Sequence, residues 1–431
     1  MPLPRKQNKN PQLILISQYF GSIVYNRLTS QYFAFDRETT DLLIRLSSKP
    51  FDRILSEMKE SKHKTHVLRF YEHFYERGFF TLDQKFAGTI LNVDPPSDHL
   101  VGPLTVHLEV VDSCNLKCKH CFAGNLPRNE QALSLNELEE LFVSMASIGT
   151  FRLGLTGGEP LLRQDLFEII DLALDYGLSP CLTTNGLLIT EEIALELGKR
   201  DLAWLNVSME GASSQTHDYI RGNGTFNKVI DRISILSDYT RFSLAFTIMR
   251  SNIQEIKACA ELAHRVGAEA AVFRPLYPVG SVQHNPELLI SFSEYLHALK
   301  ELSDMREHLP GTVFQFCSIH PWGPQTRINS QSLVYTNFGC GAGNTVCSVS
   351  VSGDVSPCSF LDPSYIAGNI RDTSFQSIWH NSRTFKEIRS LPGNENCVEC
   401  KHYGICGGGC RARALFLNGS INAPDPYCLA D

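Results

Sequence analysis

Apolar residues follow two different periods in the first part of the chain. Three short apolar runs, at 14–16, 21–25 and 32–35, are separated by polar turns and predict a three-stranded meander. Across residues 39–75 the apolar positions recur at helical spacing, which predicts three helices. We therefore expect residues 1–90 to form a small winged-helix-like domain. No single residue in it is diagnostic, so a purely structural appendage is an alternative.

Strand-like and helix-like runs alternate from Pro103 to Pro278. This alternation is typical of a parallel sheet whose strands are joined by crossover helices, so we predict an α/β fold. Residues 81–102 include Pro95 and Pro96, lack periodicity and are expected to be a linker. The predicted strands span residues 106–111, 152–156, 179–183, 204–209, 242–249 and 270–274, and the predicted helices span residues 134–145, 165–175, 191–197, 226–237 and 253–266.

The composition limits the class of protein. The chain has 431 residues, of which 43% are hydrophobic, and this is enough for two or three domains with buried cores. The net charge of -7 is spread without blocks, which gives no electrostatic case for nucleic acid. No stretch reaches the ~18 apolar residues of a membrane span, and the run at 13–16 is too short for a signal peptide. We expect a cytoplasmic protein, in which 14 cysteines indicate metal sites rather than disulfides.

Three cysteines follow the first strand of the alternating region. Cys114, Cys118 and Cys121 have the spacing Cys-x3-Cys-x2-Cys. Three thiolates leave one iron of a 4Fe-4S cluster without a protein ligand, and that iron can chelate S-adenosylmethionine and cleave its sulfonium to a carbon radical. Zinc is the alternative, but structural zinc usually takes four ligands in Cys-x2-Cys pairs. The motif resembles that of the radical SAM superfamily, which implies a partial (β/α)6 TIM barrel with its chemistry at the C-terminal ends of the strands.

Further motifs follow later strands and match the same family in order. Gly157, Gly158, Glu159 and Pro160 combine glycines that let backbone approach a ligand with an acceptor for an ammonium group. The resemblance implies that this motif contacts the methionine amine of S-adenosylmethionine and that Arg221 pairs with its carboxylate. It also assigns cofactor contacts to the ends of the third, fourth and sixth strands, with adenine at the last: Thr184, Asn185, Ser208, Glu210 and Phe273.

The other motif cysteines gather near the C-terminus, at spacings that closely resemble the SPASM domain. The resemblance implies two auxiliary 4Fe-4S clusters, and therefore three clusters in the chain. For the fourth ligand of the first auxiliary cluster we favour Cys347, with Cys317 or an open iron as alternatives. A double zinc ribbon is the competing interpretation. The implied sets are Cys340, Cys358, Cys410 and the fourth ligand for the first cluster, and Cys397, Cys400, Cys406 and Cys428 for the second.

Residues 1–90 resemble the peptide-recognition domains of ribosomal-peptide modification pathways, which are similar to the chaperone of pyrroloquinoline quinone biosynthesis. The resemblance implies that a precursor's leader peptide adds as a strand to the sheet edge and lies against a helix. A DNA-binding winged helix competes with this interpretation. However, the predicted third helix, at 67–77, carries as many acidic residues as arginines. The expected organisation is a peptide-recognition domain at 1–90, a radical SAM core at 103–280, a bridging region at 281–339 and a SPASM domain at 340–431.

These resemblances imply a radical SAM oxidoreductase that modifies a ribosomally made precursor peptide. A 5'-deoxyadenosyl radical would abstract hydrogen and lead to a crosslink, a thioether or an excised fragment. The motifs bind cofactor and clusters rather than substrate, so they identify neither the bond nor a catalytic base. Alternatives are an anaerobic sulfatase-maturing type of enzyme, which leaves the N-terminal domain without a leader, and a non-catalytic iron-sulfur scaffold, which the intact motifs disfavour. Expected partners are the precursor peptide, an electron donor such as flavodoxin or ferredoxin, and a small accessory recognition protein, but neither nucleic acid nor a membrane.

Overall fold

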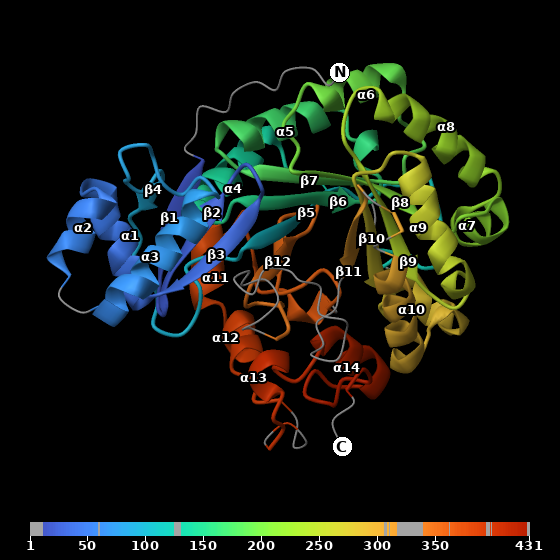
Figure 1. Cartoon of the computed structure of the whole chain (residues 1–431). Coiled ribbons are helices and arrows are strands. Elements are labelled where there is room, and N and C mark those ends of the chain that lie inside the picture. Colours follow the sequence, from blue (N-terminus) through green and yellow to red (C-terminus); the bar gives the residue numbers. More distant parts are fainter. Residues whose placement is uncertain are drawn as a thin grey trace.

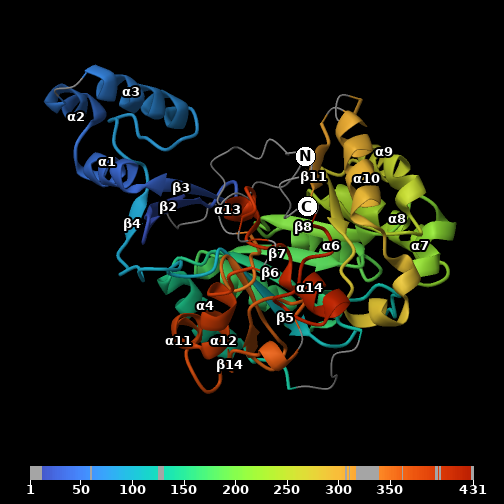
Figure 2. The same cartoon turned by 90° about the horizontal axis from the view of Figure 1, so that it is seen from below.

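Two β-sheets organise the molecule, one of four strands near the N-terminus and one of ten strands (Figures 1 and 2). Within the part of the chain that the structure describes, no helix is both long and apolar enough to cross a membrane. The structure is a computed structural model and describes residues 12–58, 61–124, 131–305, 308–309, 311–316, 339–361, 363–393, 397 and 399–428.

The N-terminal sheet contains the predicted meander and one further strand. Its first three strands pair antiparallel in sequence order, as predicted, and three helices follow them. The fourth strand pairs in parallel with the first and lies inside the segment that we expected to be a linker. It has only three residues, too few for a periodic signal. The elements are β1 (Leu13–Gln18), β2 (Gly21–Asn26), β3 (Gln31–Asp36), α1 (Arg37–Ser48), α2 (Phe51–Glu57), α3 (Ser61–Tyr75) and β4 (Thr89–Leu91).

Both faces of this sheet are buried. Alternate side chains point to opposite faces of a strand, so Leu15 packs in the core beneath α1–α3, whereas Ile16 joins the core of the larger sheet. A hydrogen bond and a ring contact hold the second face against the larger sheet. The Phe151 N–H donates to Tyr32 Oη at 3.1 Å, and the Tyr25 ring stacks on the Phe151 ring at a centroid distance of 5.3 Å. The N-terminal sheet is therefore fixed to the rest of the molecule, with its helices on the far side (Figure 1).

The central six strands are parallel, are adjacent in sequence order and begin and end within one residue of their predicted bounds. This confirms the predicted α/β barrel-like core. A seventh parallel strand from the bridging region, which we did not predict, extends the sheet. The strands are β5 (Thr105–Val111), β6 (Arg152–Gly157), β7 (Ser179–Thr184), β8 (Trp204–Met209), β9 (Ser243–Ile248), β10 (Ala270–Pro275) and β11 (Val313–Phe316).

Helices separate these strands along the chain and cover the sheet (Figure 1). The first begins with a capping box, in which the Ser134 and Glu137 side chains each accept from the other residue's backbone N–H. The outward strand residues Val106, Leu108 and Val110 are buried, whereas the inward His107 is exposed to the barrel interior. The helices are α4 (Leu135–Ser147), α5 (Leu166–Asp175), α6 (Glu191–Gly198), α7 (Ser214–Arg221), α8 (Thr225–Ser237), α9 (Ile256–Arg265) and α10 (Phe292–Asp304).

The cysteine-rich tail continues the large sheet on its other edge. Its first strand pairs in parallel with β5, and two short strands follow in antiparallel order. Trp379 is fully buried and its indole N–H donates to Leu100 O at 2.8 Å, which ties the tail to the segment before β5. The tail elements are β12 (Val346–Val349), β13 (Asp354–Ser356), β14 (Gly368–Asn369), α11 (Phe375–Asn381), α12 (Arg383–Arg389), α13 (Tyr403–Cys406) and α14 (Arg411–Asn418).

Candidate cofactor site and cysteine sets

The three motif cysteines lie in the loop that follows β5. All three residues are partly buried, and none of them forms a disulfide. Burial raises the pKa of Cys118 to about 11, and the nearby Cys121 and Cys114 thiols act in the same direction. Thiolates crowded in this way need a bound cation to stay deprotonated, which fits a cluster whose irons the thiolates ligate.

The two motif glycines allow the backbone to pack directly against the start of the cysteine loop. At Gly157 (φ +123°) a Cβ would lie 2.2 Å from Val111 O, and at Gly158 it would lie 2.0 Å from Ser113 O. The Gly158 N–H donates to Val111 O at 2.7 Å and the Glu159 N–H donates to Ser113 O at 2.9 Å. These glycines are therefore required by contact with the cysteine loop itself, a reason that the sequence motif did not reveal.

Glu159 is 1% exposed and joins the ends of β6 and β7. Its Oε1 accepts from Thr184 Oγ1 at 2.6 Å and from the Leu161 N–H at 3.1 Å, and its Oε2 accepts from the Asn185 N–H at 2.8 Å. Burial raises the pKa of this carboxyl group, and the three donors act against that effect. A carboxylate offers about four acceptor positions, so one remains for an ammonium group. Pro160 is buried directly after it and begins a short 3-10 turn.

Glu210 is the centre of a buried charge network. Its Oε1 lies 3.0 Å from His120 Nε2 and 2.7 Å from an Arg221 guanidinium nitrogen. Its Oε2 accepts from the Thr247 N–H at 3.1 Å. Burial alone would raise the pKa of Glu210, but His120 and Arg221 together hold it at about 2. His120 comes from the cysteine loop and Arg221 from α7, so the network joins three separate parts of the chain at one end of the barrel.

Three polar atoms near this network are buried without a hydrogen-bond partner among the described residues. They are His120 Nδ1, Arg221 Nε and His217 Nε2. An unpaired buried donor or acceptor is costly and is rare in native proteins. The Arg221 guanidinium therefore has a spare N–H beside the cysteine loop, where an additional acceptor would stabilise it.

Strand alternation decides which residues of β10 face the barrel interior. Phe273 is fully buried and stacks on Phe246 at 5.3 Å and on Phe314 at 6.3 Å, so its side chain belongs to the core. This placement argues against the adenine contact expected for this side chain. The next residue, Arg274, is the one exposed position of the strand. Ser208 is partly exposed at the corresponding end of β8.

Arg274 and His107 are interior residues to which the sequence motifs assign no role. Although His107 is open to the space inside the barrel, desolvation by the protein around it lowers its pKa to about 4, and the Arg274 charge acts in the same direction. The two side chains therefore share the interior although they come from β10 and β5. Side chains alternate between the two faces of a strand, and neighbouring strands are in register. If Ser208 is taken as inward-facing, the same alternation predicts that His107 and Arg274 also face inward.

The first auxiliary cysteine set is partly assembled. Cys340, Cys358 and Cys410 pack in one small core cluster. The Cys410 thiol donates to Cys340 and, against burial, lowers the pKa of Cys340, with the backbone N–H groups of Arg411 and Ala342 acting in the same direction. Three neighbouring cysteines, one of which loses its proton more readily than usual, suit an iron-sulfur cluster, because the irons are ligated by thiolates.

Cys347 is not a member of that small core cluster, although its thiol is near enough to Cys358 for the two to interact electrostatically. It pairs with Val106 in the β12–β5 ladder and belongs to the large apolar core, where burial raises its pKa. In a strand this position shares a face with Val349, which is fully buried in the same core. This placement argues against Cys347 as the fourth ligand. Cys317 lies outside the described residues.

The second auxiliary set is spread over the last part of the chain. The Cys400 N–H donates to Cys397 O at 3.2 Å, so these two lie on one turn. Burial raises the pKa of Cys406, and the nearby Cys428 thiol acts in the same direction. The Cys428 residue is exposed. The described contacts thus place Cys397 near Cys400 and Cys406 near Cys428.

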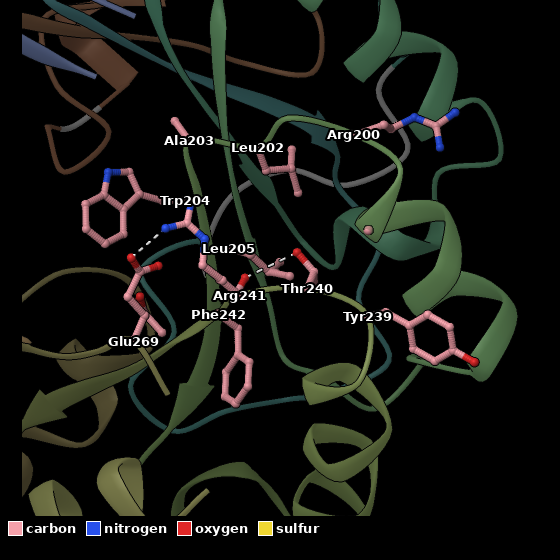
Figure 3. Close-up of a pocket in the computed structure, with 12 residues that line it drawn as sticks. Arg200, Leu202, Ala203, Trp204, Leu205, Tyr239, Thr240, Arg241, Phe242 and Glu269 are labelled. Carbon is pink, nitrogen blue, oxygen red and sulfur yellow. Dashed lines mark hydrogen bonds and ion pairs between the residues drawn. The ribbon is translucent and has the colours of Figure 1, made fainter. Parts of the chain in front are cut away.

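A cleft at the opposite end of the barrel contains none of these residues (Figure 3). Its lining includes Trp204, Arg241 and Glu269, which lie at or just before the first residues of β8, β9 and β10. Arg241 forms an ion pair with Glu269 at 2.8 Å. Barrel chemistry collects at the C-terminal ends of strands, so this cleft is not the cofactor site.

Comparison with known proteins agrees with this geometry. Residues 108–263 match the radical SAM superfamily, and residues 340–401 match the SPASM iron-sulfur cluster-binding domain. The chain is 29% identical to the mycofactocin maturase MftC of Mycolicibacterium smegmatis, over 77% of this chain and 83% of that protein. It is 33% identical to the AdoMet-dependent heme synthase of Methanosarcina barkeri, over 76% of this chain and 97% of that protein.

Solved structures share the fold over nearly the whole length. Streptococcus suis SuiB bound to S-adenosylmethionine has a TM-score of 0.73 at 16% identity, covering 97% of this chain and 99% of that one. SuiB bound to its precursor peptide SuiA has a TM-score of 0.72 at 15% identity, covering 96% of this chain and 98% of that one. Because only 3–4% of this chain lies outside these matches, they must include the N-terminal sheet and its helices.

Proposed function

Because this chain belongs to the radical SAM superfamily and carries a SPASM iron-sulfur domain, we propose that it is an enzyme that modifies a precursor peptide. The observation that supports this most is the N-terminal sheet and helix unit fixed beside the barrel, since SuiB, whose fold matches across that unit, binds a precursor peptide. MftC, by its name a maturase, points the same way.

The residues at the C-terminal end of the barrel suit S-adenosylmethionine and a cluster. When bound, these groups supply a carbon radical able to remove hydrogen from a substrate. Cys114, Cys118 and Cys121 would hold the cluster. Glu159 would accept from the cofactor's ammonium group through its remaining acceptor position, and Arg221 would donate through its spare N–H to the carboxylate.

The remaining motif residues would complete this site. Gly157 and Gly158 fix the loop, Thr184 and Asn185 hold Glu159 in place, and Ser208 faces the interior as a polar contact. The tail cysteines would hold two auxiliary clusters. An electron donor such as flavodoxin or ferredoxin, a small accessory recognition protein and a cytoplasmic location complete the proposal.

The leader peptide would dock on the edge strand β3. The sheet order leaves β3 at the outer edge, and helix α3 lies over it, with Phe70 and Phe35 in edge-to-face contact at 5.8 Å. An extended peptide can satisfy the backbone groups of such an edge and place alternate side chains against the helix. Phe70 is only partly buried, so it offers an apolar contact next to the edge.

We predict that Phe70→Asp weakens leader binding about tenfold or more, because it places an unpaired carboxylate in an apolar contact. Binding of a labelled leader peptide measures this directly. Leu68→Asp is the matched control, since it adds the same charge to an exposed position on another face of α3. Equal losses in both variants, or none, would contradict docking at this edge. Point changes are preferable to deletion of residues 1–90, which would uncover the core face that packs on Phe151.

Cys347 provides a separate prediction about the first auxiliary cluster. Because its side chain lies in the large core, we expect Cys347→Ser to keep the same iron content, whereas Cys358→Ser loses iron. Iron analysis of anaerobically reconstituted protein gives the answer. Loss of iron in the Cys347 variant would instead show that Cys347 is the fourth ligand of the first auxiliary cluster, as the sequence predicts.

A heme-synthase-like activity on a tetrapyrrole is the second candidate. It is favoured by the 33% identity to a protein named AdoMet-dependent heme synthase, which the match covers almost completely. The decisive experiment is to co-express this protein with a short peptide encoded next to its gene and to analyse that peptide by mass spectrometry. A mass change in the peptide supports the first proposal, and turnover of a porphyrin with an unchanged peptide supports the second.

A further inference from the structure

A buried ion pair lies between the two auxiliary cysteine sets. We call Arg413 and Asp425 the tail ion pair; their side chains are 2% and 1% exposed. Asp425 Oδ1 accepts from Arg413 Nε at 2.8 Å, and Oδ2 accepts from an Arg413 terminal nitrogen at 2.8 Å. This two-pronged geometry is the strong form of such a pair.

The same aspartate contacts a cysteine of each set. Its Oδ2 accepts from the Cys410 backbone N–H at 2.6 Å, and its backbone carbonyl accepts from the Cys428 N–H at 2.8 Å. The approach is so close that a Cβ at Gly409 would lie 2.4 Å from the Asp425 Cβ. Asp425 therefore fixes the turn that presents the exposed Cys428 relative to buried Cys410.

Aromatic rings anchor this arrangement to the barrel. The Arg413 guanidinium lies over the Tyr427 ring at 4.1 Å, and that ring stacks on Phe292 of α10 at 4.8 Å. The Asp425 Oδ1 also accepts from the Tyr427 N–H at 3.0 Å. The last residues of the described chain are thus held by charge, hydrogen bonds and ring contacts at once.

Stability alone is a weak explanation for the tail ion pair. Two charges removed from water pay a desolvation penalty that their attraction often only balances, so apolar residues of similar volume would serve as well for packing. What an ion pair adds is a fixed geometry of donors and acceptors. Here that geometry links one cysteine from each set.

We propose that the tail ion pair is a positioning element that sets the relative placement of the two auxiliary clusters and the charge around the first. This proposal rests on the proposed assignment of Cys410 to the first cluster and Cys428 to the second. Arg413 and Asp425 would contact neither substrate nor S-adenosylmethionine. They would act through the backbone of the two cysteine residues.

The test is Asp425→Asn in the full chain after anaerobic reconstitution. Asparagine keeps the size and one acceptor oxygen but leaves the Arg413 cation uncompensated beside Cys410. We expect the second auxiliary cluster to be lost or labile, which removes up to about four irons per chain. We also expect the potential of the first auxiliary cluster to move positive, because an uncompensated cation stabilises the reduced form. The site cluster should keep its spectrum.

Glu269→Gln is the matched control, because it breaks an exposed ion pair of similar length, Arg241–Glu269 at 2.8 Å, far from the cysteines. Iron content and potentials should not change in this control. If Asp425→Asn fails to fold, the variant with Arg413→Met and Asp425→Asn removes both charges and avoids a buried unpaired ion. It should lose the same iron, with a smaller shift of potential.

Full iron content and unchanged potentials, in Asp425→Asn or, where that variant does not fold, in the double variant, would overturn the proposal. Failure of the underlying assignment looks different. In that case Cys410→Ser and Cys428→Ser would themselves retain all iron in the same assay, whatever the tail ion pair does.

Discussion

Replacing Cys114, Cys118 and Cys121 together with alanine is expected to abolish reductive cleavage of S-adenosylmethionine. The three thiols share one loop after β5, and the core cluster that holds Cys340, Cys358 and Cys410 contains none of them. Of about 12 irons in three clusters, about four should be lost. Iron analysis and chromatographic detection of 5'-deoxyadenosine under a chemical reductant measure both effects.

The remaining clusters serve as the internal control of that experiment. The triple variant should still bind the iron of the two auxiliary clusters, because Cys340, Cys358 and Cys410 pack in their own core cluster. If the triple variant still cleaves S-adenosylmethionine, Cys114, Cys118 and Cys121 do not hold the cluster that carries out this cleavage.

Glu210→Ala is expected to destabilise the apo-protein by about 3–5 kcal/mol, the usual cost of leaving a buried charge without its partner. Arg221 is only 9% exposed and would lose its carboxylate at 2.7 Å. Chemical denaturation of the metal-free protein measures the change in the free energy of unfolding. Glu269→Ala, which breaks the exposed pair with Arg241 at 2.8 Å, is the control and should cost about 1 kcal/mol or less.

The same network predicts a pH dependence. The folded state holds the pKa of Glu210 at about 2, below its ordinary value of 4.5. A depressed carboxyl pKa stabilises the folded state above the ordinary pKa, and that contribution disappears as the pH falls from about 4.5 towards 2. Acid unfolding of the wild-type protein should therefore show a loss of stability in this range that Glu210→Gln lacks. Identical acid profiles would contradict the assignment of the charge to Glu210.

The sequence by itself determined the strand order of the core and the cysteine motifs. Both are local signals, since strand and helix periods and the spacing of Cys114, Cys118 and Cys121 depend on near neighbours along the chain. It also determined that Glu159 and Glu210 follow strands whose C-terminal ends meet. It left out β4 and β11, which are too short to carry a period, and it did not show that the Phe273 side chain is buried in the core.

Only the tertiary structure decided which distant groups meet. The network of His120, Glu210 and Arg221, like the contact of Asp425 with Cys410, joins segments whose separation along the chain carries no periodic signal. Packing likewise decides that both faces of the N-terminal sheet are buried and that the Cys347 side chain lies in the large core. Burial and pairing energies depend on all the neighbours of a group in space, and a sequence pattern records only its neighbours along the chain.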